Sequence, residues 1–110
     1  MEIVIVEDFQ CGMRRCLVLK REMPRLGGRE MAVYYNGYVE LLPCDRCCDL
    51  NLESEEETFR GKLDSLNEEY VGFDTAHSWN FETPYTQRKA YSVEACKKIV
   101  DELNFKRLKR

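Results

Sequence analysis

The stretch Ser92-Val93-Glu94-Ala95-Cys96-Lys97-Lys98-Ile99-Val100-Asp101-Glu102-Leu103 carries the clearest periodic pattern in the chain. Ser92 is a favourable helix N-cap, and Glu94 stands in the first turn, where a carboxylate complements the helix dipole. Lys106 and Arg107 complement the opposite pole near the far end. The pattern therefore predicts an amphipathic helix of about three turns. Its apolar stripe consists of Val93, Cys96, Ile99, Val100 and Leu103.

Short runs rich in β-branched and aromatic residues precede this helix and predict strands. The runs are Glu2–Val6, which the polar Glu7-Asp8 closes, then Cys16–Leu19, Met31–Tyr35, Tyr38–Leu42, Thr58–Leu63 and Glu69–Phe73. The Pro and Gly-Gly of Met23–Gly28 predict the loop of a hairpin. The expected fold is α+β, a twisted antiparallel sheet with one C-terminal amphipathic helix packed on it.

The dipeptide Asn36-Gly37 leaves two arrangements open. Asn-Gly between two β-rich runs is a strong hairpin signal, because a type I′ turn needs positive φ at both central residues. The alternative is one long strand with a bulge at Gly37. The residues favour neither arrangement over the other.

Length and composition indicate one ordinary globular domain over residues 1–110, with 44% hydrophobic and 34% charged residues. The net charge of −3 has the wrong sign for a dedicated nucleic-acid binder. The longest apolar runs are only a few residues, so we expect no membrane span or signal peptide and a cytoplasmic location. Six cysteines in such a chain favour reduced thiols or a metal over a disulfide framework.

The tyrosines beside Asn36-Gly37 favour binding of a protein partner over catalysis. Side chains alternate along a strand, so these tyrosines cannot all face one core, and an exposed tyrosine is a common anchor for a protein partner. The first third of the chain is also rich in arginine and lysine, although such a cluster is more often a solvated face. We predict a partner-binding surface from Tyr34, Tyr35, Tyr38, Arg25 and Arg29.

A second candidate site follows the strand that ends at Phe73. The only histidine and the only tryptophan of the chain, His77 and Trp79, lie close to Asp74 and Asn80. Asp and His could act as acid and base, and the indole could stack on a ring. At a strand end, however, such residues often only bond to the backbone. These four residues are a candidate ligand site, in which we weight a structural role above binding, and binding above catalysis.

The cysteines suggest a third candidate site. If Cys16–Lys20 pairs antiparallel with the strand that ends at Leu42, Cys11 approaches Cys44, Cys47 and Cys48, and the Cys44-x₂-Cys47 spacing suits zinc. Cys48 or His77 could complete the tetrahedron, and unligated thiols are the simpler alternative. We expect no cofactor, with a structural zinc as the alternative. Cys96 belongs to the helix stripe and is expected to pack in the core.

Several short motifs together resemble a family of small uncharacterised proteins encoded by phages and prophages. The family pattern is G-Y-V, then T-F-x-G, then G-F-D-x-A-H, followed by a helix. The matching residues here are Arg15–Leu19, Asn36–Val39, Thr58–Gly61, Gly72–His77 and a helix from about Val93. The chain departs from the family at Glu55–Glu57, where His-Gly-Gly is usual, and at Asn80, where an aspartate is often found. These departures affect any shared polar site.

The resemblance implies an accessory protein of a phage or mobile element that acts in the cytoplasm of a bacterial host. Together with the tyrosine surface, it leads us to expect a non-enzymatic protein that inhibits host defence, as anti-CRISPR proteins do, by docking on a nuclease or effector. The alternative is a sponge for a signalling nucleotide that uses the Asp74–Asn80 region at an oligomer interface such as that of a homodimer. A hydrolase using Asp74 and His77 comes third.

Overall fold

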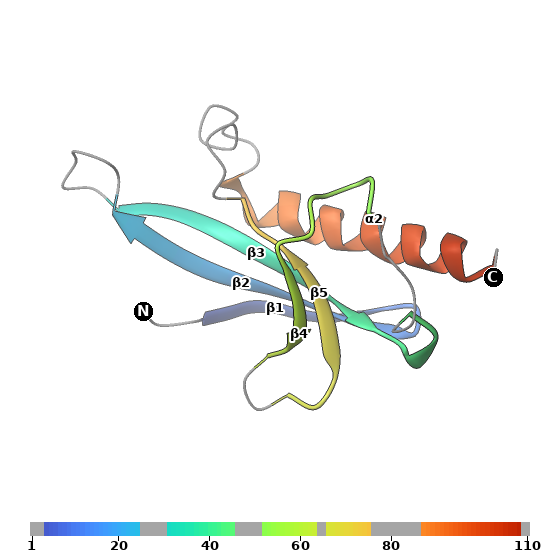
Figure 1. Cartoon of the computed structure of the whole chain (residues 1–110). Coiled ribbons are helices and arrows are strands. Elements are labelled where there is room, and N and C mark those ends of the chain that lie inside the picture. The colour runs from blue at the N-terminus through green and yellow to red at the C-terminus, as the bar shows by residue number, and fades with distance from the viewer. Residues whose placement is uncertain (1–3, 25–30, 46–51, 64–65, 76–86, 109–110) are drawn as a thin grey trace.

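The computed structural model describes residues 4–24, 31–45, 52–63, 66–75 and 87–108. Within them, five strands form one antiparallel sheet in the order β1-β2-β3-β5-β4, and helix α2 lies along one face (Figure 1). The elements are β1 (Val4–Cys11), β2 (Arg14–Pro24), β3 (Met31–Leu41), the short 3₁₀ helix η1 (Pro43–Asp45), β4 (Phe59–Lys62), β5 (Glu69–Phe73) and α2 (Lys89–Leu108). The predicted α+β architecture is confirmed.

A tight turn that the sequence analysis missed joins β1 to β2. Cys11 pairs with Arg14, so Gly12 and Met13 are the two central residues of the turn. Gly12 has a φ of 62°, a conformation that glycine adopts without steric cost. The hairpin predicted between β2 and β3 is confirmed, because these strands pair as far as Pro24 with Met31. Met23 and Pro24 of the predicted loop belong to β2, and the rest of that loop lies outside the described residues.

The predicted end of the first strand at Glu7-Asp8 is wrong, because β1 continues to Cys11. The acidic residues remain in the strand because each has a counterion. Glu7 accepts from Lys89 Nζ at 2.9 Å, and Asp8 accepts from Arg15 Nη2 at 2.8 Å. The register shifts between Ile5 and Glu7, which marks a bulge.

Asn36-Gly37 lies inside β3, so the hairpin reading of this dipeptide is wrong. The alternative of one long strand is confirmed, because β3 runs through the dipeptide. The bulge that this alternative placed at Gly37 is absent from the pairing with β2, whose register has no shift there. A Cβ at Gly37 would overlap the ring of Phe73 and lie 2.8 Å from Cys96 Sγ. Glycine is required here for close packing and not for a turn.

The two faces of the sheet carry separate apolar clusters. The larger one lies between the sheet and α2, and its fully buried members include Val18, Val39, Val71 and Phe73 from the strands and Ile99 and Leu103 from the helix. The smaller one lies on the opposite face, where the rings of Tyr38 and Phe59 meet edge to face at 5.6 Å. It consists of Leu17, Leu19, Tyr38 and Tyr70, with Phe59, Leu63 and Leu66 packed against them.

Helix α2 begins three residues before the predicted cap. Ser92 is inside the helix and fully buried, and its Oγ donates to the carbonyl of Tyr35 at 3.3 Å. The prediction that Ser92 is the N-cap and that Glu94 lies in the first turn is therefore wrong. The predicted stripe is largely right, because Cys96 and its apolar neighbours along the helix are buried.

The β2–β3 hairpin extends past its neighbours in the described part of the chain. Pairing with β1 stops at Lys20, and pairing with β5 begins at Gly37. The paired segments Arg21–Pro24 and Met31–Tyr34 continue beyond both, and the ribbon points away from the body of the molecule (Figure 1). We call these two segments the hairpin arm.

Candidate functional site

A buried ion pair between Arg14 and Asp45 is the most constrained polar group in the described residues. Both side chains have no exposed surface, and Arg14 Nη1 lies 2.6 Å from Asp45 Oδ2. A second bond runs from Arg14 Nη2 to Asp45 Oδ1 at 3.3 Å, so the pair is bidentate. A charge removed from water requires such a partner, because its desolvation is otherwise very costly.

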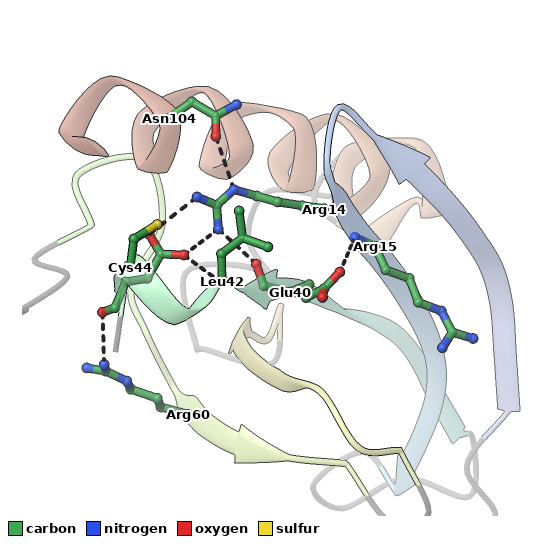
Figure 2. Close-up of polar contacts among 8 residues, drawn as sticks. Arg14, Arg15, Glu40, Leu42, Cys44, Arg60 and Asn104 are labelled. Atoms are coloured by element: carbon green, nitrogen blue, oxygen red, sulfur yellow. Dashed lines mark hydrogen bonds and ion pairs between the residues drawn. The ribbon is translucent and has the colours of Figure 1, made fainter. Parts of the chain in front are cut away.

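The remaining donors of Arg14 bind two further segments (Figure 2). Its Nη1 also donates to the backbone carbonyl of Glu40 at 3.0 Å, and its Nε donates to Asn104 Oδ1 at 3.1 Å. One side chain therefore joins β2 to the end of β3, to the η1 turn and to the C-terminal part of α2. We call Arg14, Glu40, Asp45 and Asn104 the arginine lock.

Asp45 also organises its own turn. Its Oδ2 accepts from the N–H of Leu42 at 2.7 Å, and its N–H donates to the carbonyl of Leu42 at 2.9 Å. Arg60 Nη2, on β4, donates to the Asp45 carbonyl at 3.4 Å (Figure 2). These bonds hold a buried carboxylate and guanidinium in fixed positions, which suits a structural role.

The sequence analysis missed the arginine lock, although one signal was present. Arg14 precedes Cys16 and Val18 at alternating positions of a strand whose members face α2. An arginine in phase with a buried stripe requires an internal counterion. Asp45 stands inside the Cys44-x₂-Cys47 element, and its position in the sequence does not reveal that its carboxylate bonds within the η1 turn.

Two of the four proposed zinc ligands, Cys11 and Cys44, belong to the described residues. Cys11 ends β1, directly across the turn from Arg14, and Cys44 adjoins Asp45 in η1. Cys44 is exposed, and its Sγ lies 3.9 Å from Asp45 Oδ1. Cys11 is half-buried and packs against the cluster under α2, where burial raises the pKa of its thiol.

Cys47 and Cys48 lie outside the described residues, so the full zinc set stays a prediction. Among the residues that are described, no three His, Cys, Asp or Glu side chains are arranged to hold a metal ion. The exposed position of Cys44 and the inward position of Cys11 place these two thiols in different surroundings.

Two further thiols meet beneath the helix. Cys16 of β2 and Cys96 of α2 are fully buried in the same apolar cluster. Hydrogen bonding between the two side chains lowers the pKa of Cys16 and raises the pKa of Cys96. The prediction that Cys96 packs in the core is confirmed.

The candidate ligand site after β5 is described only at its beginning. Asp74 is half-buried and follows the last residue of β5. Thr75 Oγ1 donates to the carbonyl of Tyr35 at 3.0 Å and accepts from its N–H at 3.3 Å, and Gln87 Nε2 donates to the Thr75 carbonyl at 2.7 Å. These three hydrogen bonds fix the position of Thr75, where the chain leaves β5. His77, Trp79 and Asn80 lie outside the described residues, so ligand binding there stays a prediction.

The predicted partner surface is divided by the sheet. Tyr34 and Tyr38 are 8% and 5% exposed on the face away from α2, whereas Tyr35 is half-buried on the helix side. Tyr38 belongs to the smaller core cluster and accepts from Asn36 Nδ2 at 3.4 Å. These rings therefore contribute to packing. Arg25 and Arg29 belong to the segment joining the two strands of the hairpin arm, which lies outside the described residues.

The comparisons with known proteins add no relative. No protein-family model, curated protein or solved structure matches the chain. In the described part of the chain, no helix has the length and apolar character needed to cross a membrane.

Proposed function

We propose that this chain is an accessory protein of a phage or mobile element that inhibits a host defence system by binding one of its protein components, as anti-CRISPR proteins do. The hairpin arm is the observation that supports the proposal. Arg21 and Tyr34 form its first pair beyond β1 and β5, and Val33 and Glu22 are exposed on it. A two-stranded projection from a packed body offers side chains and backbone to a partner while the core stays intact.

The arrangement of the polar groups supports binding over catalysis. Arg14 and Asp45, the charged pair of the arginine lock, are buried and bonded inside the protein, and the ion pair between Asp8 and Arg15 holds β1 to β2. These groups serve the fold. A nuclease or effector of the host is the partner class we propose, with the cytoplasm of a bacterial host as the site of action.

Capture from a host extract tests the proposal. Tagged protein should retain a specific host protein, and the double variant Glu22→Arg/Val33→Glu, at two exposed positions of the hairpin arm, should lose it. The matched control is Arg88→Glu/Lys98→Glu, which reverses two charges at exposed positions near and on α2, outside the hairpin arm. Equal capture by both double variants would remove the hairpin arm from the proposal.

A phage challenge tests the biological half of the proposal. Host cells that carry an active defence system should regain phage plaques when they express the wild-type chain, and the arm variant should not restore them. Both variants must first show wild-type circular dichroism, so that loss of function is not loss of fold. Unchanged immunity in hosts that carry each of the major defence systems would contradict the proposal.

A further inference from the structure

We draw no further inference here: the strongest candidate, the free outer edge of β1 with the exposed side chains of Val4 and Ile5, carries none because nothing in the structure shows what covers it.

Discussion

Replacing Asp45 with alanine is expected to destabilise the protein severely. The change leaves the buried guanidinium of Arg14 without its counterion and the N–H of Leu42 without its acceptor. Removing one partner of a buried ion pair costs about 3–5 kcal/mol. An orphaned buried donor adds about 1–3 kcal/mol. Because a domain of this kind has a free energy of unfolding of about 5–15 kcal/mol, the variant loses much or all of its stability.

Urea unfolding followed by far-UV circular dichroism measures this effect. Asp8→Ala is the matched control, because Asp8 also forms a bidentate pair with an arginine, but with 47% of its side chain exposed. That change should cost less than about 1 kcal/mol. Asp45→Asn is the milder test, since it keeps an oxygen for Leu42 and removes only the charge. If Asp45→Asn and Asp8→Ala lower the free energy of unfolding equally, the reasoning is refuted.

A double variant distinguishes the cost of an unpaired buried charge from the cost of the lost hydrogen bonds. Replacing both partners of a buried pair by apolar residues of similar volume is often nearly neutral. Arg14→Met/Asp45→Leu should therefore be more stable than Asp45→Ala, although it still lacks the acceptor for Leu42. The single variants Arg14→Met and Asp45→Leu are measured beside it. If the double variant loses as much free energy of unfolding as the two single variants together, the unpaired buried charge is not the cause of the destabilisation.

Four further outcomes follow from the structure. Tyr70→Phe should leave the free energy of unfolding unchanged or raise it by up to about 1 kcal/mol in urea unfolding, because the buried hydroxyl of Tyr70 has no well-formed hydrogen bond among the described residues; a clear loss would show that its interaction with the nearby guanidinium of Arg15 stabilises the fold. Gly72→Ala should cost about 1–3 kcal/mol because its Cβ would overlap the ring of Tyr38, and the added change Tyr38→Leu should recover part of that loss. The pKa of Asp8 should lie below its ordinary value of 3.8 in an NMR titration, since its arginine partner bonds to the ionised form; its stabilisation is then complete above that value and declines as the pH falls through the lower folded pKa, a decline that Asp8→Asn should remove. If the chain is instead a nucleotide sponge, a cyclic nucleotide at about 100 times its dissociation constant should add about 2.7 kcal/mol in a thermal-shift assay and His77→Ala should abolish the gain; an indifferent wild-type protein ends that alternative.

The fold was predictable where one local pattern and the tertiary packing agree. β5 was placed at Glu69–Phe73 with the bounds it has, because its apolar run is buried on both faces. β4 is the predicted Thr58–Leu63 shortened by one residue at each end. In both cases the side chains that make the strand recognisable are those that the sheet buries.

The errors occur where distant partners override the local signal. Asn36-Gly37 has the chemistry of a turn, yet Phe73 and Cys96 come close to Gly37 and keep the dipeptide inside a strand. Glu7 looks like the end of a strand until Lys89, far along the chain, neutralises it. The arginine lock is the same case for the candidate site, because it depends on the meeting of four segments, β2, the end of β3, η1 and α2, which no local pattern shows.

The two glycine–aromatic contacts between β3 and β5 carry a consequence for folding. Phe73 covers Gly37 on the helix side, and in the next pair of the ladder Tyr38 covers Gly72 on the other side. If β5 paired with β3 one position out of register, the rings of Phe73 and Tyr38 would no longer lie over Gly37 and Gly72. Both rings would then meet side chains instead of glycine backbone. Misaligned pairing is therefore penalised on both surfaces at once, so these two strands should find a single alignment even though their sequences are short.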